Sequence, residues 1–389
     1  MEFSTRKTRR GFLQAAAQVL PAAALTITAK ASAAESRVIF SEGQIAGLRL
    51  TNRLVRSATS ENAWRDNGMI DEGVNLYRNV AAGGVGLIVT GAMAVMASGR
   101  DNDLQSRIYD DRYLKGLSRI PTVVHQTRPD CKVVVQMMHV GMKGHVAEPV
   151  GPTATPWPTS QVKPRALTTK EVEDVVANFA QAIRRAKEVG FNGAQIHGAH
   201  GYLVSSFLSP YTNTRTDRYG GSMEKRALIV REIVEQARKL VGPDFPILIK
   251  MNCDDAVQGG IDIDSFPPLA AELEKAGIQS VEVSGANTAQ QGTGGEQPHF
   301  LKYAQKLTVK VPVIVTGANH SIERLEQVAK AGTPQFFGLA RPLVREPNLP
   351  ARWQEGRGSP EAACIACNRC LRGFAKGLIT RCRVAETNL

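Results

Sequence analysis

The chain has 389 residues, of which 43% are hydrophobic and 22% charged, and it carries a formal net charge of +12. This length and composition suit an ordered globular protein with a large core, built as one α/β barrel or as two domains, and they exclude an intrinsically disordered chain. No basic run is interleaved with aromatic residues, so we expect no nucleic-acid partner despite the positive charge.

The first 33 residues have the pattern of an export signal. Residues 8–13 (TRRGFL) form a twin-arginine motif, residues 15–27 are mostly apolar, and residues 31–33 (ASA) offer a cleavage site. The alternative, a disordered basic tail, does not account for the order of these regions. We therefore predict a twin-arginine signal peptide over 1–33, the twin-arginine export machinery as a partner, and a periplasmic or exported protein. No longer apolar segment follows, so we expect no membrane span in the mature form.

After the signal, short apolar runs alternate with stretches of helical periodicity. The helical stretches are clearest at 170–189, 223–241, 265–276 and 322–331. Eight apolar runs are predicted strands, at 52–57, 86–90, 132–138, 193–197, 246–251, 279–284, 311–316 and 335–340. This alternation predicts a (β/α)₈ TIM barrel over 34–350, followed by a short Cys-rich segment over 351–389. A doubly wound sheet is the alternative, and the lack of a G-x-G-x-x-G motif after a strand counts against it.

The hexapeptide 197–202 (HGAHGY) follows the fourth predicted strand. Gly198 and Gly201 allow sharp turns, so that His197, His200 and Tyr202 can converge on one small volume. Two N–H donors suit an oxygen that gains negative charge, and a phenol can give or take a proton. The trio suits chemistry at a carbonyl conjugated to a double bond, although a solvated loop could carry the same residues.

Other polar or glycine positions lie where barrel strands end, which is where barrel enzymes carry their chemistry. Lys250 interrupts the apolar fifth strand and needs a partner, because burying an ammonium alone is costly. It is either a functional cation or one half of an ion pair with a carboxylate such as Glu282. Gly317 and the pair Ala340-Arg341 end the last two strands, where barrels often hold a phosphate.

The residues around the hexapeptide form a long motif. It comprises 195–202, 207–210, Asn213, 215–217, 219–222 and Arg226, and further matches lie at 52–55, 136–139, 313–317 and 340–343. In these segments the chain resembles the Old Yellow Enzyme family, whose members are FMN-dependent ene-reductases on a (β/α)₈ barrel. The resemblance covers residues 36–350 in the family's order.

The resemblance implies roles for individual residues. Gln136 would bind the pyrimidine edge of the flavin, Lys250 would stabilise negative charge on the reduced flavin, and Arg341 would help to hold the phosphate. The implied catalytic residues are His197 and His200, which bind the substrate carbonyl, and Tyr202, which protonates Cα. The implied cofactor-binding residues are Ala58, Thr59, Ser60, Ala92, Gln136, His197, Lys250, Gly317, Ala340 and Arg341.

These residues predict an oxidoreductase that passes hydride from reduced FMN to the β-carbon of an α,β-unsaturated carbonyl or related activated alkene. Two alternatives remain open. One is an iron–sulfur flavoprotein dehydrogenase that acts on an amine or another small substrate with a protein redox partner. The other is an electron carrier without a substrate of its own. The converging His197, His200 and Tyr202 favour the alkene.

A second motif lies near the C-terminus. Cys364, Cys367, Cys370 and Cys382 form a C-x₂-C-x₂-C-x₁₁-C pattern and are four of the six cysteines. Three closely spaced thiolates and a distant fourth suit a [4Fe–4S] cluster, whereas structural zinc more often uses two separated C-x₂-C pairs. The segment resembles the cluster-binding region of trimethylamine dehydrogenase and 2,4-dienoyl-CoA reductase. Zinc, free thiols and disulfides remain alternatives at this point.

The electron donor follows from the compartment. NAD(P)H is the expected donor in the cytoplasm, whereas an exported enzyme would need a protein electron donor, with the cysteine site as a possible entry point. The expected partners are therefore a small activated alkene and either NAD(P)H or a protein donor. The sequence leaves the oligomeric state open.

Overall fold

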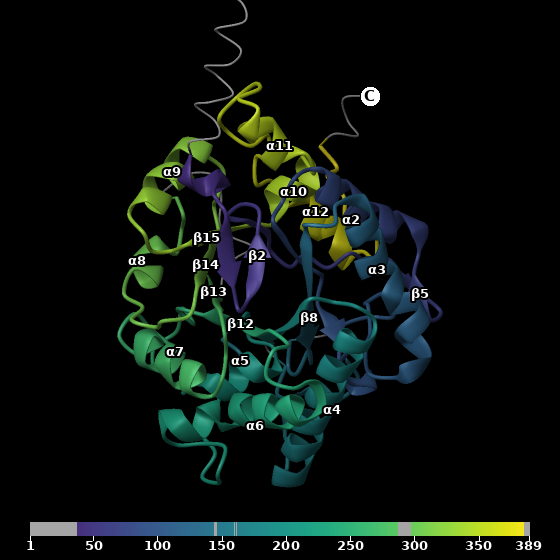
Figure 1. Cartoon of the computed structure of the whole chain (residues 1–389). Helices are drawn as coiled ribbons and strands as arrows, with labels where there is room; N and C mark the ends of the chain where they lie inside the picture. Colours follow the sequence, from purple (N-terminus) through teal and green to yellow (C-terminus); the bar gives the residue numbers. More distant parts are fainter. Residues whose placement is uncertain (1–36, 144–145, 159, 161, 287–296, 385–389) are drawn as a thin grey trace, which may run out of the picture.

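The computed structural model describes residues 37–143, 146–158, 160, 162–286 and 297–384, so the predicted signal peptide lies outside the described residues. Eight parallel strands surround a central axis, and β15 pairs with β3 while β11 pairs with β8, which closes the barrel (Figure 1). The eight strands are β3 (Leu54–Arg56), β6 (Leu87–Val89), β8 (Lys132–Met138), β11 (Gly193–Gly198), β12 (Ile247–Asn252), β13 (Val281–Ser284), β14 (Val313–Thr316) and β15 (Phe336–Leu339). The predicted (β/α)₈ TIM barrel is confirmed.

The four predicted helices are present, with ends within one residue of those expected. They are α4 (Thr169–Glu188), α6 (Met223–Val241), α7 (Phe266–Lys275) and α9 (Ile322–Lys330). Helix α4 begins at a capping box, in which Thr168 accepts from the backbone of Glu171 and the Glu171 side chain accepts from the backbone of Thr168. The remaining α-helices among the described residues are α2 (Asp71–Ala82), α3 (Leu114–Thr127), α5 (Leu203–Leu208), α8 (Leu301–Ala304), α10 (Arg341–Arg345), α11 (Leu349–Gln354) and α12 (Arg369–Ala375).

Several strands are shorter than the apolar runs that predicted them. The first begins at Leu54 and not at residue 52, because Asn52 uses its side chain to accept from the backbone of Leu54 and Gly86. The side chain of Asn52 therefore links the start of β3 to the start of β6, while Asn52 itself is not part of the sheet. Short additional strands lie outside the barrel's eight: β4 (Trp64–Arg65), β5 (Gly68–Met69), β7 (Met93–Ala94), β9 (Val150–Gly151) and β10 (Arg165–Ala166).

A hairpin that was not among the predicted elements closes one end of the barrel. It consists of β1 (Gly43–Ile45) and β2 (Leu48–Leu50), and Ile45 and Leu50 are fully buried. Both pack into the cluster that fills the barrel interior, together with Val89, Val134 and other strand residues. This apolar plug leaves the opposite end, where the strands finish, as the place for polar chemistry.

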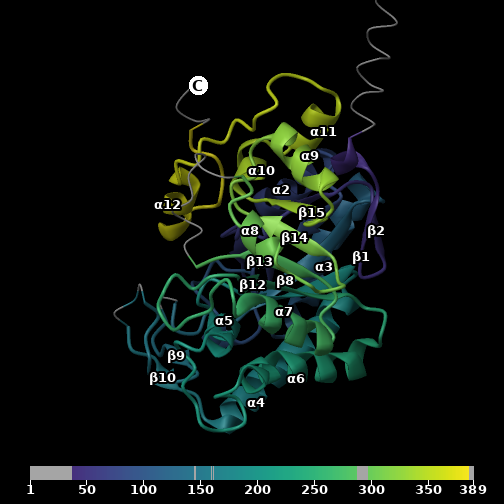
Figure 2. The same ribbon diagram turned by 90° about the vertical axis from the view of Figure 1, so that its left-hand side faces the viewer.

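Figure 2 shows the hairpin and the C-terminal segment at opposite ends of the barrel, with α12 beside the mouth where the strands finish. The backbone N–H of Thr380 donates to Glu61 (2.9 Å), and the side chain of Asn62 donates to the carbonyl of Phe374 (2.9 Å). The Cys-rich segment is thus packed on the loop that follows β3.

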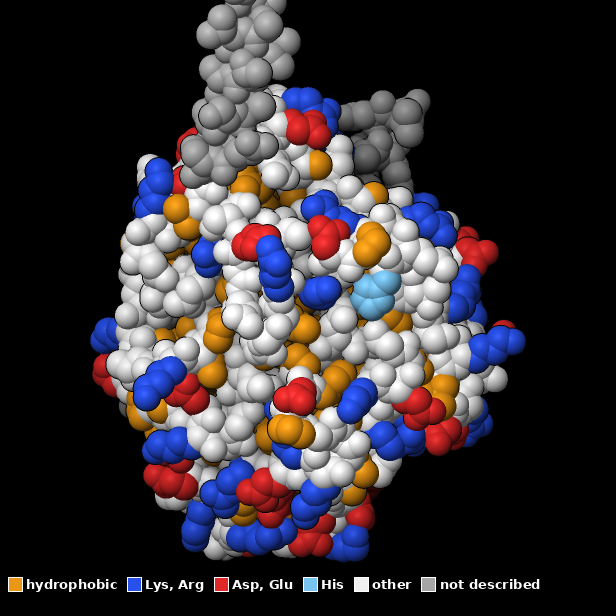
Figure 3. Space-filling view, viewed as in Figure 1, with side chains coloured by type: hydrophobic (Ala, Val, Ile, Leu, Met, Phe, Trp, Pro, Cys, Tyr) orange, Lys and Arg blue, Asp and Glu red, His pale blue; other side chains and the backbone are white. Residues whose placement is uncertain are grey.

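On the face seen in Figure 3, acidic and basic side chains are interspersed and apolar side chains are scattered. Many of the charges are exposed pairs, such as Lys170–Asp174 and Arg184–Glu188 on α4. Pairs of this kind stabilise a helix only slightly. Among the described helices, none is long and apolar enough to cross a membrane.

Candidate active site

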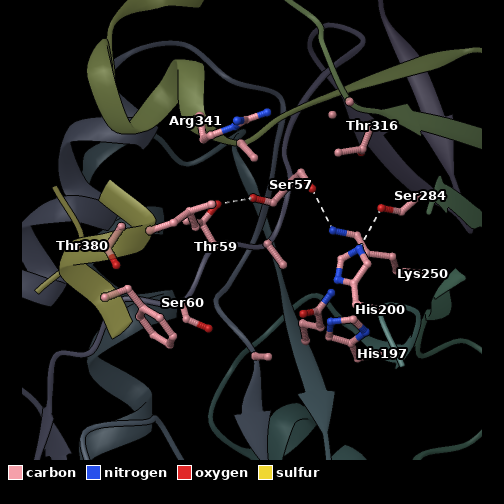
Figure 4. Close-up of a pocket in the computed structure, with 18 of the residues that line it drawn as sticks. Ser57, Thr59, Ser60, His197, His200, Lys250, Ser284, Thr316, Arg341 and Thr380 are labelled. Atoms are coloured by element: carbon pink, nitrogen blue, oxygen red, sulfur yellow. Dashed lines mark hydrogen bonds between the residues drawn. The ribbon is translucent and has the colours of Figure 1, made fainter. Parts of the chain in front are cut away.

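A cavity of about 250 Å³ opens at the barrel mouth. Figure 4 shows residues that line this cavity. The two histidines and Lys250 lie on the right of the view, and Arg341, Thr59 and Ser60 lie on the left. Every predicted catalytic or cofactor-binding residue lines this one cavity: Ala58, Thr59, Ser60, Ala92, Gln136, His197, His200, Tyr202, Lys250, Gly317, Ala340 and Arg341. The structure therefore brings together residues that span more than 280 positions of the sequence.

The ring of His197 is in contact with both His200 and Tyr202. The ring of His197 lies edge-on to His200, with ring centroids 5.0 Å apart, and edge-on to Tyr202, with centroids 4.8 Å apart. His197 is the last side chain of β11 before Gly198, whereas His200 and Tyr202 belong to the turn into α5. The predicted convergence of the three polar groups is thus present.

The turn that positions His200 has a strained backbone. His200 has a φ of +63°, and its N–H donates to Oδ1 of Asn252 (2.8 Å), which holds it in place. Gly201 has a φ of +77°, and a Cβ there would come within 2.6 Å of the Trp157 indole. Only glycine therefore fits at position 201, for both conformational and steric reasons.

Both imidazoles are neutral at neutral pH. Burial, followed by the neighbouring His200 and Lys250, lowers the pKa of His197 well below its usual value. Burial, followed by the charge of Lys250, lowers the pKa of His200 to about 3. The two rings can therefore offer neutral N–H donors to a ligand without bringing a second positive charge beside Lys250.

The hydrogen bonds of each ring indicate where its proton lies. Nδ1 of His197 accepts from the N–H of Ala199 (3.3 Å), so the proton is on Nε2. Nε2 of His200 lies 2.8 Å from Oγ of Ser284. When Ser284 donates this bond, the proton of His200 is on Nδ1.

Tyr202 is a protonated phenol. Burial, followed by the negative charge of Asp101, raises its pKa above the usual value. A phenol of raised pKa holds its proton at neutral pH and recovers it readily after giving it away. This is what a proton donor to a carbanionic carbon requires.

The sequence left open whether Lys250 is a functional cation or one half of an ion pair, and the structure shows that it lines the cavity and is also paired. Its Nζ lies 3.0 Å from Oε1 of Glu282 and donates to Oγ of Ser57 (2.8 Å), and its side chain is 3% exposed. It is therefore one half of a buried ion pair, and it also lines the cavity. The pair leaves Lys250 charged at the wall of the cavity.

Gln136 is held by a neighbouring glutamine. Its Nε2 donates to Oε1 of Gln195 (2.7 Å), and Nε2 of Gln195 in turn donates to Oε2 of Glu282 (2.8 Å). The strands β8 and β11 place Gln136 and Gln195 side by side in register. This arrangement leaves Oε1 of Gln136 as a hydrogen-bond acceptor at the cavity wall.

The opposite end of the cavity is built from the last two strands. Gly317 has a φ of +117°, and the neighbouring Gly338 has no room for a side chain, because a Cβ would meet Oγ1 of Thr316 at 2.0 Å. Arg341, which begins α10, contributes a guanidinium and donates to Oδ1 of Asn368 (2.6 Å). Glycine backbone at the cavity wall and a cation beside it suit a phosphate group.

The Cys-rich segment also reaches this cavity, because Leu371, Phe374 and Thr380 line it. The four cysteines of the motif are half-buried free thiols around a second, smaller cavity that Arg341 and Arg345 also line: Cys364, Cys367, Cys370 and Cys382. Within the described part of the chain, no three His, Cys, Asp or Glu side chains are grouped closely enough to hold one metal ion.

Comparison with known proteins identifies the family. The model of the NADH:flavin oxidoreductase / NADH oxidase family matches residues 39–359. The chain belongs to this family. It is 33% identical to an NADH oxidase of Thermoanaerobacter brockii over 362 residues, which cover 89% of this chain and 55% of that protein. It is 30% identical to an NADPH dehydrogenase of Bacillus cytotoxicus over 320 residues, which cover 80% and 90% of the two chains.

Solved structures agree with the fold. A 2-naphthoyl-CoA reductase matches with a TM-score of 0.83 and 26% identity over 90% of this chain and 56% of its own. Morphinone reductase matches with a TM-score of 0.70 and 24% identity over 82% and 91% of the two chains. The chain thus spans about half the length of several proteins it matches, among them the NADH oxidase and the 2-naphthoyl-CoA reductase.

The cavity fits the cofactor of this family of oxidoreductases, FMN. At one end, Lys250 and the acceptor of Gln136 suit the carbonyl and N–H groups of a flavin pyrimidine ring, and at the other end Arg341 and the glycine backbone suit its phosphate. The chain therefore belongs to a family of FMN-binding oxidoreductases, and its cavity fits that cofactor. FMN supplies hydride chemistry when bound, and the individual cofactor contacts remain predictions.

Some residues of the site were not singled out from the sequence. Ser57, Gln195 and Thr316 bind Glu282 behind the cavity wall, and Ser284 binds His200. All four lie within or directly after barrel strands, and Ser57, Ser284 and Thr316 lie at the ends that face the mouth. A survey of every strand end, including the sixth, would have found Ser284, but the partners of Glu282 are recognisable only in the folded barrel.

Proposed function

We propose that the protein reduces activated alkenes, with FMN as the hydride donor to the β-carbon of an α,β-unsaturated carbonyl or related compound. The observation that carries this proposal is the contact of His197 with His200 and with Tyr202 in the cavity that Lys250 also lines. Two neutral N–H donors and a protonated phenol match the needs of an oxygen that gains charge and a carbon that takes up a proton.

Each residue has a distinct task in this proposal. Nε2–H of His197 and one ring N–H of His200 bind the substrate oxygen, polarise the alkene and stabilise negative charge on that oxygen. Tyr202 gives its proton to Cα and takes another from solvent. Lys250 and Gln136 hold the flavin at its pyrimidine edge, and Arg341 holds its phosphate.

The test is anaerobic turnover of an enone, an enal and a nitroalkene by the purified holoenzyme, with product identification by chiral chromatography. We expect the saturated product, and reoxidation of the prereduced flavin only when an activated alkene is present. If none of the three compounds reoxidises the flavin, the alkene proposal fails, and an electron carrier without its own substrate becomes the better description.

We further propose that the four cysteines of the C-terminal motif bind a [4Fe–4S] cluster. They lie around one cavity, and each thiolate of such a cluster binds a different iron, so its ligands need not converge on a single point as they do for one metal ion. The neighbouring Arg341 and Arg345 offset the negative charge of the thiolates. Zinc is the lesser alternative.

Iron and sulfide assays on protein purified without oxygen test the cluster. About four irons per chain, lost in Cys370→Ser with FMN retained, would support it. Zinc in place of iron, or no metal at all, would refute it. If iron is present, an iron–sulfur flavoprotein dehydrogenase acting on an amine becomes the second candidate, and flavin reduction by amines in the absence of NAD(P)H distinguishes it from the alkene reductase.

The electron donor and the location are parts of the same proposal. The similarity to an NADH oxidase and an NADPH dehydrogenase supports a nicotinamide donor, whereas export through the twin-arginine signal favours a protein donor. Fractionation of cells that express the full chain, with and without Arg9→Lys and Arg10→Lys together, tests the export. Fast flavin reduction by NADPH and indifference to Cys364→Ser would argue against a protein donor.

A further inference from the structure

Glu282 is a carboxylate with no exposed surface, directly behind the wall of the flavin cavity. The register of β12 and β13 places it beside Lys250. Its two oxygens accept from four donors: Lys250 at 3.0 Å, Ser57 at 2.6 Å, Thr316 at 2.6 Å and Gln195 at 2.8 Å. A carboxylate with this many donors is built to remain charged.

The alternative, a neutral carboxylic acid, does not fit these contacts. Burial acts to raise the pKa of Glu282, but the charge of Lys250 and the hydrogen bonds of Ser57 and Thr316 outweigh it, so the pKa is lowered. A protonated oxygen would also need an acceptor, whereas Gln195 and Lys250 approach as donors. The interior of the barrel therefore contains a negative charge next to Lys250.

We propose that Glu282 is a positioning residue that acts on the flavin through Lys250. By offsetting the charge of Lys250, Glu282 lowers the reduction potential of bound FMN. A flavin gains negative charge at its pyrimidine edge on reduction, so an isolated cation at that edge stabilises the reduced form and raises the potential. An ion pair has a weaker field than an isolated cation. With Glu282 present, the bound flavin is a stronger reductant than Lys250 alone would allow.

Glu282 also fixes the hydrogen-bonding direction of Gln136. Because a carboxylate only accepts, the amide nitrogen of Gln195 must point toward Glu282, and its oxygen must then point toward Gln136. The nitrogen of Gln136 is used in that bond, and its oxygen is left to accept from an N–H of the cofactor. A single carboxylate thus sets both the charge and the polarity presented to the pyrimidine edge.

The test is the reduction potential of FMN in the holoenzyme, measured by equilibration with redox dyes and without an alkene. Glu282→Gln should raise the potential, by the equivalent of about tenfold tighter binding of reduced over oxidised FMN, or about 30 mV for a two-electron couple. Glu282→Asp, which keeps the charge, should stay close to the wild type. An unchanged or lower potential in Glu282→Gln with FMN fully bound would overturn the proposal.

A double-mutant cycle separates charge from packing. Lys250→Met should lower the potential, and the double variant Lys250→Met/Glu282→Gln should lie between the two single variants. If Glu282→Gln does not fold, the double variant carries the test, because removing a buried ion pair as a whole is tolerated better than removing one partner. The reduction potential of the double variant should lie within about 30 mV of the wild-type value, the equivalent of tenfold. A larger shift would refute the proposal that Glu282 offsets the charge of Lys250. The inference depends on FMN binding alone, so these results stand whether or not the protein reduces alkenes.

Discussion

Removal of both imidazoles is the perturbation that tests the proposed substrate site most directly. In His197→Ala/His200→Ala the cavity loses two neutral N–H donors and keeps Lys250, Gln136 and Arg341, the side chains proposed to hold the pyrimidine edge and the phosphate of FMN. A hydrogen bond to a charged group contributes about 1.5–3 kcal/mol, so a phenolate ligand held by both rings should bind about 10²–10⁴-fold more weakly. The effect on alkene turnover should be greater, since each donor to a developing oxyanion contributes about 10²–10³ in rate.

The assay is a titration of the oxidised holoenzyme with a para-substituted phenol, followed by the long-wavelength absorption of the flavin–phenol complex, with FMN content measured on the same sample. His200→Asn is the matched control. Asparagine tolerates the positive φ at this position and still offers an N–H donor, so this variant should retain most of the affinity. Wild-type phenol affinity in the double alanine variant would refute the assignment of the two histidines. Loss of FMN from that variant would show that they support the cofactor instead.

Three further predictions concern other groups. Tyr202→Phe should leave flavin reduction intact and slow reoxidation by an alkene by about 10²–10⁴-fold in stopped-flow measurements, and normal reoxidation would remove Tyr202 from the mechanism. His139 has its pKa lowered by burial to about 4, so between pH 6.5 and 4 the unfolded chain binds a proton that the native chain does not. The free energy of unfolding should therefore fall by about 3 kcal/mol as the pH drops across this range, and urea titrations should show a smaller fall in His139→Gln. Cys370→Ser should lower the iron content and leave the visible flavin bands unchanged, whereas equal iron in both proteins would exclude that thiol as a ligand.

Much of the fold was determined by local sequence pattern. Eight short apolar runs and the amphipathic stretches between them predicted the barrel, because a buried parallel strand is apolar on both faces and its crossover helix has one apolar face. The closing hairpin of β1 and β2 was missed, since two three-residue strands carry too little periodicity to be recognised. The role of Ile45 and Leu50 can be recognised only in the folded protein, where both side chains pack into the barrel interior.

The residues proposed to act in the site were also predicted from the sequence, from the strand ends and from a long family motif, and the structure places them in one cavity. Only the tertiary structure decided how they act on one another. Lys250 could be a free cation or half of an ion pair, and the register of β12 and β13 makes it both a cavity residue and the partner of Glu282. Protonation states and hydrogen-bond directions depend on burial and on partners far apart in the chain. The neutral histidines, the oriented Gln136 and the contact of the Cys-rich segment with the flavin cavity therefore became visible only when the barrel had closed.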